Sequence, residues 1–280
     1  MYNSTLNMSD LQHDESGMSF LEHLEAFRWV LVRSAIAVVL AAAGAFVLYR
    51  HVFDGIILAP MSPSFFTNRV LCAIGTYLGS NSLCINSTPL NIININMAGQ
   101  FNTHLQVSFL AGVIVAFPFI VAQIWLFIKP ALYETERKGT RGAVAYITFL
   151  FVLGVLFGYF IISPLTIHFL GNYSISESVK NQISLSSYIS SITSVTFATG
   201  LLFELPVLVF FLTKAGIITP DFLRKYRRHA FVVILVVAAV ITPPDVLSLI
   251  LVAFPLWLLF ELSISVSAKN IRRREKASNT

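Results

Sequence analysis

The sequence predicts an all-α polytopic membrane protein, and three observations lead to that fold class. First, 56% of its 280 residues are hydrophobic and only 12% are charged, and the mean hydropathy is +0.75. Soluble globular domains carry about 25% charged residues. Second, the apolar residues form six stretches separated by polar segments. Third, the basic residues gather in alternate polar segments, which is typical of proteins that cross a membrane several times.

The chain is expected to begin with a disordered tail, residues 1–18, which is polar and acidic and therefore unlike a secretory signal peptide. Residues 19–33 predict an amphipathic helix, because Phe20, Leu24, Phe27 and Leu31 fall on one stripe. We expect this helix to lie on the cytoplasmic membrane surface and to lead into the first span.

A long polar segment, Tyr49 to His104, follows the first span and is rich in Asn, Ser, Pro and Gly. A loop of this length commonly has a structure of its own, so we expect a structured cap on the extracytoplasmic face. Residues 91–97 are β-prone. Cys72 and Cys84 lie in this segment, where one disulfide and two separate thiols are both open alternatives.

Three longer spans form the middle of the predicted bundle. The second span contains Pro118, which predicts a bent helix, and the third contains Gly154 and Gly158, which allow close contact between helices. The fourth contains Glu204 and Pro206. An ionisable side chain at membrane depth costs roughly 2.5 kcal/mol or more to insert, so Glu204 is a candidate functional residue that faces protein or water.

The last two apolar stretches are short, with a Thr-Pro-Pro-Asp hinge between them. A helix formed by either stretch is shorter than the roughly 30 Å thickness of the hydrocarbon core. We therefore expect local thinning of the bilayer or a re-entrant hairpin. A basic cytoplasmic tail, residues 268–280, ends the single membrane domain that covers residues 1–280. The six expected spans are 29–48, 105–128, 143–168, 188–213, 230–242 and 246–264.

Charge placement predicts the orientation. Sixteen of the 19 Lys and Arg residues lie in the N-terminal helix, in the segments 129–141 and 214–229, and in the tail. The intervening segments hold Arg50, Arg69 and Lys180. By the positive-inside rule, both termini are expected in the cytoplasm.

The motifs of soluble enzymes are absent from the sequence. It has no phosphate-binding loop, no dinucleotide fingerprint, no HExxH zinc motif and no GxSxG elbow, and its six histidines are scattered singly. We therefore expect no enzyme activity, no metal site, no cofactor and no nucleic-acid partner. Transport, channel activity and recognition of a guest segment in the membrane remain as classes of function.

Four local patterns together identify a resemblance. They are Leu21 to Arg28 at the start of the first helix, Phe117 to Arg137 across the end of the second span, Phe203 to Val207, and Ile241 to Ser248. In this combination, the chain from about Phe20 to Ser267 resembles TatC, the polytopic subunit of the twin-arginine protein translocase. The resemblance implies six helices, both termini in the cytoplasm, two short last helices, and a place in the prokaryotic cytoplasmic (inner) membrane.

The resemblance also implies that the protein binds the twin-arginine signal peptides of folded precursor proteins. Carboxylates hold a guanidinium pair best, in bidentate geometry at a partly desolvated surface. Glu136 matches the loop glutamate of the family, with Arg137 beside it, and Phe127 and Gln123 match the aromatic and amide residues that precede it. Without the motif, Glu136 would be read as a solvated charge that pairs with Arg137 or a neighbouring lysine.

The N-terminal part of this site departs from the family pattern, because Ala26 stands where a second glutamate is usual. We hypothesise that Glu22, four residues earlier on the same helical face, supplies the missing charge, with Glu25 as the adjacent candidate. The alternative is that both are solvated surface carboxylates.

The hinge between the last two stretches matches the polar patch on which, in the family, single-span subunits of the TatA/TatB type dock. Thr242, Asp245 and Ser248 are the matching residues, but Leu249 replaces the usual glutamine. An N-cap role for Asp245 is an alternative that is compatible with docking.

The sequence therefore predicts a receptor and core component of the twin-arginine translocase, which also contacts copies of itself and the lipid bilayer. It would bind signal peptides at its cytoplasmic face and assemble single-span partners for export. The alternative is a proton-coupled secondary transporter that uses Glu204 as its relay group. If the protein is a translocase receptor, we expect Glu204 to be a polar residue within the membrane that is hydrogen-bonded and that brings water locally into the bilayer.

Overall fold

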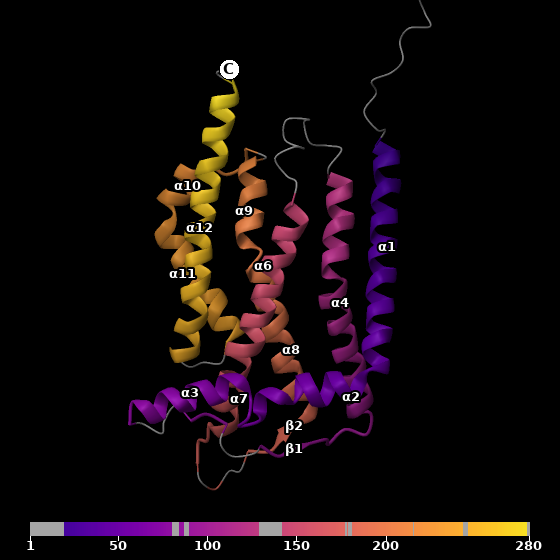
Figure 1. The fold of residues 1–280 in the computed structure, drawn as a ribbon, viewed down its shortest axis with the longest axis vertical. Helices are drawn as coiled ribbons and strands as arrows, with labels where there is room; N and C mark the ends of the chain where they lie inside the picture. The colour runs from indigo at the N-terminus through magenta and orange to yellow at the C-terminus, as the bar shows by residue number, and fades with distance from the viewer. Residues whose placement is uncertain are drawn as a thin grey trace, which may run out of the picture.

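The computed structural model describes residues 20–79, 84–86, 90–128, 142–176, 178, 181–214, 216–242 and 246–278, and the side chains of these residues except 20–23, 247 and 270–278. The expected N-terminal tail lies outside these ranges. Long helices stand side by side in a bundle, and short helices and a small sheet form a cap at one end (Figure 1). The elements in chain order are α1 (Phe20–Val47), α2 (Tyr49–Val52), η1 (Phe53–Ile57), η2 (Ala59–Met61), α3 (Phe66–Tyr77), β1 (Ile92–Ile93), α4 (Gly99–Ile128), α6 (Ala143–Phe157), η5 (Gly158–Ile162), α7 (Ser163–Asn172), β2 (Ile183–Ser184), α8 (Leu185–Leu202), α9 (Leu205–Lys214), α10 (Pro220–Lys225), α11 (Arg227–Ile241) and α12 (Val246–Ser278).

Five helical segments in the described part of the chain are long and apolar enough to cross a membrane. The fold class expected from the sequence, a helical polytopic membrane protein, is therefore confirmed, whereas the count of six spans is not. The helix that falls short is α11, with 15 residues. The five segments are Leu24–Val47, Gly99–Ile128, Ala143–Asn172, Leu185–Lys214 and Ser248–Lys269.

Two helices differ in extent from their expectation. The surface helix and first span expected over 19–33 and 29–48 form one continuous helix, α1, of 28 residues. The last helix was expected to be short, but α12 has 33 residues and continues without a break into the basic tail. Both the start of α1 and the end of α12 lie at the end of the bundle opposite to the cap (Figure 1).

The fourth span is broken in its middle. The α8 helix ends at Leu202, and α9 begins at Leu205, so Phe203 and Glu204 lie in the turn between them. Pro206 occupies the first turn of α9, where a missing N–H donor is tolerated because the first N–H groups of a helix have no intrahelical partner. The proline therefore sets the position of the break.

The broken span packs very closely against α6. A Cβ added at Gly154 would lie 2.7 Å from the carbonyl oxygen of Thr199 and 2.8 Å from the Cβ of Phe203. A Cβ added at Gly200 would likewise lie 2.8 Å from Val155. Such distances are well inside van der Waals contact, so only glycine lets the backbones of α6 and α8 approach this far. This confirms the role that the sequence suggested for Gly154.

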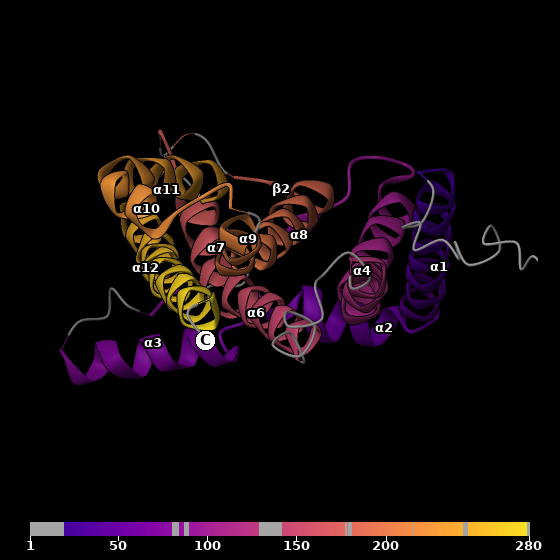
Figure 2. The same cartoon turned by 90° about the horizontal axis from the view of Figure 1, so that it is seen from above.

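Helices α1 and α4 form a second close pair (Figure 2). A Cβ added at Gly112 would lie 2.7 Å from the backbone nitrogen of Ala42. Toward the cap, the rings of Phe46 and His104 stack with centroids 3.9 Å apart, and His104 Nε2 is 3.1 Å from the carbonyl oxygen of Phe46. The pair is thus fixed along most of its length.

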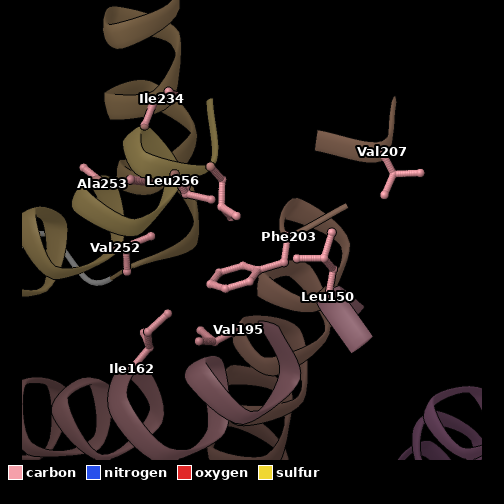
Figure 3. Close-up of a cluster of buried hydrophobic side chains, with 11 residues drawn as sticks. Leu150, Ile162, Val195, Phe203, Val207, Ile234, Val252, Ala253 and Leu256 are labelled. Atoms are coloured by element: carbon pink, nitrogen blue, oxygen red, sulfur yellow. The ribbon is translucent and has the colours of Figure 1, made fainter. Parts of the chain in front are cut away.

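The main apolar cluster lies where the broken span meets α6, α11 and α12 (Figure 3). Phe203 is 5% exposed, and its ring points from the break toward Val195, Ile162 and Val252. The ring of Phe157 on α6 lies 5.6 Å away. Packing of Phe203 in this cluster therefore fixes the residue next to Glu204.

The cap is held together by buried asparagines. Asn86 has a φ of 52°, a left-handed conformation that asparagine tolerates better than most residues, and it is 3% exposed. Its Nδ2 donates to the carbonyl oxygen of Pro164 at 3.1 Å. Asn68 on α3 donates to the carbonyl oxygens of Pro60 and Ser62 at 3.0 and 2.8 Å. The Asn86 bond connects the cap to the end of the third span, and the Asn68 bonds hold α3 to the segment before it.

A disulfide and a small parallel sheet complete the cap. Cys72 on α3 is bonded to Cys84, which decides between the two alternatives that the sequence left open. Strand β1, in the β-prone segment 91–97, pairs with β2 so that Ile92 lies opposite Ile183. The expectation that this segment has a structure of its own is confirmed.

The close contact at Gly154 predicts that Gly154→Ala destabilises the protein. The added methyl group must displace the backbone of α8, and such overpacking costs about 1–3 kcal/mol. Thermal unfolding of the purified protein in detergent would measure the loss. Gly44→Ala is the matched control, because a Cβ there meets nothing within 4 Å and alanine is the better helix former. Equal melting temperatures for the two variants would contradict the packing described here.

The disulfide predicts that a double Cys72→Ser, Cys84→Ser variant is less stable. The bridge joins residues 12 apart in the sequence, and closing a loop of that length contributes about 3 kcal/mol in the chain-entropy interpretation. Alkylation followed by mass spectrometry checks the bond directly. Both cysteines of the wild-type protein should react only after reduction, and reaction before reduction would contradict the assignment.

Candidate functional site

The residues expected to bind a signal peptide begin at the end of the bundle opposite to the cap. There the ring of Phe127 on α4 lies 5.5 Å, centroid to centroid, from the ring of Phe27 on α1. Phe27 belongs to the Leu21 to Arg28 pattern, and Phe127 to the pattern at the end of the second span. The close α1–α4 pair therefore brings two patterns that are about a hundred residues apart into direct contact.

Gln123 lies one turn before Phe127 on α4 and is half-buried, as Phe127 is. Between them, the ring of Trp125 lies 5.8 Å from that of Phe211 on α9. This contact joins α4 to the second half of the broken span. The candidate amide and aromatic residues thus lie on a helix end that packs against α1 on one side and α9 on another.

The two alternative glutamates on α1 lie on a different face from Phe27. Each residue advances about 100° round an α-helix, so Glu25 is about 160° and position 22 about 140° round from Phe27. Glu25 is exposed, and the side chain of Glu22 lies outside the described residues. Position 22 lies about 40° from Ala26, against about 100° for Glu25. Helix geometry therefore favours Glu22 over Glu25 as the substitute for the missing glutamate.

Glu136 and Arg137 lie outside the described residues. The described part of α4 ends at Ile128, one residue past Phe127, and the chain is described again from Gly142. The structure therefore leaves the predicted roles of Glu136 and Arg137 untested.

The residues matched to the partner-binding patch are largely buried. Thr242 is 6% exposed and donates its hydroxyl hydrogen to the carbonyl oxygen of Ala238 at 2.8 Å. Ser248 is 2% exposed, and Asp245 lies outside the described residues. The surface around them is apolar instead, with Val240 81%, Val246 73% and Ile250 59% exposed. At this turn the described exposed surface is thus mainly hydrocarbon, and the polar groups of Thr242 and Ser248 are inside.

Glu204 lies in the turn between α8 and α9, and the structure does not confirm the expected hydrogen bonding. The residue as a whole is half-buried, but both carboxylate oxygens are shielded from solvent. The backbone of Phe151 on α6 lies near the carboxylate, but within the described chain neither oxygen forms a well-aligned hydrogen bond. Its backbone is satisfied, because the carbonyl oxygen accepts from the N–H groups of Val207 and Leu208 at 3.0 Å. Glu204 is therefore a buried polar group with little compensation, which costs free energy in any apolar surrounding.

Two cavities, of about 670 and 330 Å³, lie at the cap end of the molecule. Asp54, His104 and Phe101 are among the residues that line the larger one, and Thr166, Ser187 and Tyr188 among those that line the smaller. Of the candidate residues whose side chains the structure describes, none lines either cavity. Among the described residues, no group of three or more His, Cys, Asp or Glu side chains could hold a metal ion.

At the end of the bundle opposite to the cap, one residue of the candidate site was not predicted from the sequence. The sequence places Phe27 on the apolar stripe of the first helix and within the Leu21 to Arg28 pattern but gives it no role in the site, although its contact with Phe127 is what joins the two patterns. The signal that was present is its position in that stripe, which predicts burial but not the identity of the contacting helix.

The uncompensated burial of Glu204 predicts that Glu204→Leu stabilises the fold. Replacing a buried polar group that lacks a partner should gain about 1–3 kcal/mol, measured as a higher melting temperature in detergent. Glu261→Leu is the control, because Glu261 on α12 accepts a hydrogen bond from Arg227 on α11 at 2.6 Å. Loss of this carboxylate should therefore not raise the melting temperature. A clear drop in stability for Glu204→Leu would mean that the carboxylate has a partner in the membrane.

Comparison with known proteins identifies the same family that the sequence patterns resemble. The family model for "Sec-independent protein translocase protein (TatC)" matches residues 22–255. The TatC protein of Blattabacterium is 39% identical over 259 residues, which are 92% of this chain and 97% of that protein. The TatC protein of Carboxydothermus hydrogenoformans is 34% identical over 94% of this chain and 97% of its own length. TatCy of Bacillus subtilis is 37% identical over 68% of this chain and 74% of its own length.

Two solved structures have the same fold. A crystal structure of the "Twin Arginine Translocase Receptor- TatC" superimposes with a TM-score of 0.66 at 31% identity, over 88% of this chain and 98% of that one. The same receptor in DDM gives a TM-score of 0.67 at 31% identity, over 88% and 99% of the two chains. The family is one of protein transport and not of enzymes, in agreement with the expectation from the sequence. The chain belongs to the TatC family of Sec-independent protein translocase proteins.

Proposed function

We propose that this protein is the signal-peptide receptor and core component of a twin-arginine translocase. It binds the twin-arginine signals of folded precursor proteins at its cytoplasmic face and assembles single-span TatA/TatB-type subunits and further copies of itself. The contact between Phe27 and Phe127 is the observation that carries this proposal. It places the start of the N-terminal helix beside the end of α4, from which the segment with Glu136 and Arg137 continues.

The chemistry of a guanidinium pair suits such a surface. Arginine binds carboxylates in bidentate geometry, and a charge-assisted hydrogen bond is stronger where aromatic side chains exclude water. Glu136, with Glu22 from the N-terminal helix, would supply the carboxylates. Phe27, Phe127 and Gln123 would form a partly desolvated surface at this end of α1 and α4. Arg137 would hold the loop by pairing with acidic side chains.

The apolar surface at the turn between α11 and α12 supports partner docking. A single-span subunit offers a largely hydrocarbon face, which matches exposed Val240, Val246 and Ile250. Because Thr242 and Ser248 are buried, we propose that they shape this turn and that Asp245 supplies the polar contact to the partner. Glu204 would then be the polar residue within the membrane that is contacted by a signal peptide or by the transmembrane helix of a partner subunit.

The placement of the basic residues supports an orientation with both termini in the cytoplasm and the cap on the opposite side of a bacterial inner membrane. The proton-coupled transporter considered as an alternative is not favoured, since the chain belongs to a protein translocase family. Reconstitution of the protein distinguishes the two hypotheses. A transporter by itself moves a small solute, whereas a receptor by itself only binds the signal peptide.

Binding of a fluorescent twin-arginine signal peptide to the full chain in nanodiscs tests the proposal. Glu136→Gln should weaken binding at least about tenfold, which corresponds to the loss of about 1.4 kcal/mol of a charge-assisted contact. Glu22→Gln should weaken it by a similar factor, and Glu25→Gln by less, because of their different positions on α1. A peptide with two lysines should bind weakly to every variant.

The matched control is Asp221→Asn, which removes an exposed carboxylate from α10 outside the proposed site. Its affinity should equal that of the wild type. Unchanged binding in Glu136→Gln would overturn the proposed receptor site. Unchanged binding in both Glu22→Gln and Glu25→Gln would remove α1 from it.

A further inference from the structure

The short helix α3 in the cap carries an exposed apolar stripe. Phe66 is 68% exposed, Val70 40%, Ile74 46% and Tyr77 91%. Their spacing of four, four and three residues places them on one face of the helix. The described helices that are long enough to span a membrane also expose apolar side chains, but α3 has 12 residues and is not among them. Its stripe therefore needs an explanation of its own.

The opposite face of α3 is held by the protein. Asn68 and Gly75 are buried there, and Cys72 on the same side carries the disulfide to Cys84. Asn68 binds two backbone carbonyl oxygens of the preceding segment. The helix is thus attached along one face by hydrogen bonds and a covalent bond, while the other face is left without a contact that would bury it.

The order of contacts along the third span shows which way the stripe faces. At the start of α3, the hydroxyl of Thr67 donates to the carbonyl oxygen of Phe160, and the ring of Phe66 lies 6.4 Å from that of Phe160. The attached face reaches later residues, because Asn68 meets Asn86, which bonds to Pro164. Since the third span runs toward the cap from Ala143 to Asn172, the Phe66 side of α3 faces away from the cap, toward the middle of the spans.

The depth of α3 along the spans and its direction both fit a helix that lies in the membrane interface. Phe160 is 17 residues after Ala143, which is about 26 Å along a helix, close to the roughly 30 Å of a hydrocarbon core. The helix runs across the spans and not along them, and it lies at the edge of the bundle in both views (Figures 1 and 2). An amphipathic helix in this position typically lies in the membrane interface, with its apolar face among the acyl chains.

We propose that α3 is an interfacial anchor that inserts its Phe66, Val70, Ile74 and Tyr77 face into the lipid leaflet next to the cap. Arg69, the one charged residue of the helix, is exposed beside the stripe, where its guanidinium reaches the level of the lipid phosphates. The occupant is thus phospholipid and not a second protein. The disulfide and the Asn68 bonds transmit this anchoring to the cap and fix its distance from the bilayer.

Site-directed spin labelling of the full chain in nanodiscs of phosphatidylethanolamine and phosphatidylglycerol tests this. Single cysteines replace Val70, Ile74 and Tyr77 in turn, and the nitroxide is attached without reductant so that the Cys72–Cys84 bond stays intact. Power saturation then compares collisions with oxygen, which partitions into lipid, and with a nickel chelate, which stays in water. Wild-type protein should take up no label.

The three stripe positions should collide with oxygen at least threefold more often than with the nickel chelate. The lipid control is Val39, exposed on α1, and the water control is Ser174, exposed in the cap. Nickel accessibility equal to that of Ser174 would place the stripe in water and overturn the proposal. Low accessibility to both reagents would mean that a protein covers the stripe, which would also overturn it.

Discussion

The close approach of helix backbones at glycines is the constraint on which the rest of this structure depends. Gly154 and Gly200 let α6 and α8 touch at a distance where a Cβ would collide. That contact holds Phe203 in the main apolar cluster, next to Glu204 in the break before Pro206. In a membrane, helix association gains nothing from removing apolar surface from water, so close van der Waals packing has to supply the attraction.

The same constraint operates between α1 and α4. Because Gly112 lies against the backbone of Ala42, the two helices stay side by side from the cap to the opposite end. There their pairing produces the contact between Phe27 and Phe127 on which the proposed receptor site rests. A change at Gly112, which is far from this end, would therefore act on the proposed site through the angle between two helices.

Glu204 and the cap illustrate two ways in which polar groups are treated in this protein. In the cap, the Nδ2 groups of buried Asn68 and Asn86 donate to backbone carbonyl oxygens and hold segments together, although Asn86 Oδ1 is buried without a partner in the described chain. At Glu204, the carboxylate oxygens are buried with no such partner in the described chain. Hydrogen-bonded burial is consistent with a structural role, whereas uncompensated burial lowers stability and is typical of functional positions.

The class of fold and the family can be predicted from the amino-acid sequence, because hydropathy, charge placement and local patterns such as Phe203 to Val207 are properties of neighbouring residues. It also located Gly154 as a contact and the cap as a structured segment. The disulfide, the contact of Phe27 with Phe127 and the direction of the α3 stripe became known from the three-dimensional arrangement of the helices. It likewise showed that Thr242 and Ser248 are buried and that α1 and α12 are longer than expected. The physical reason is that burial and pairing depend on which helices lie next to each other, and residues far apart in the chain set that arrangement jointly.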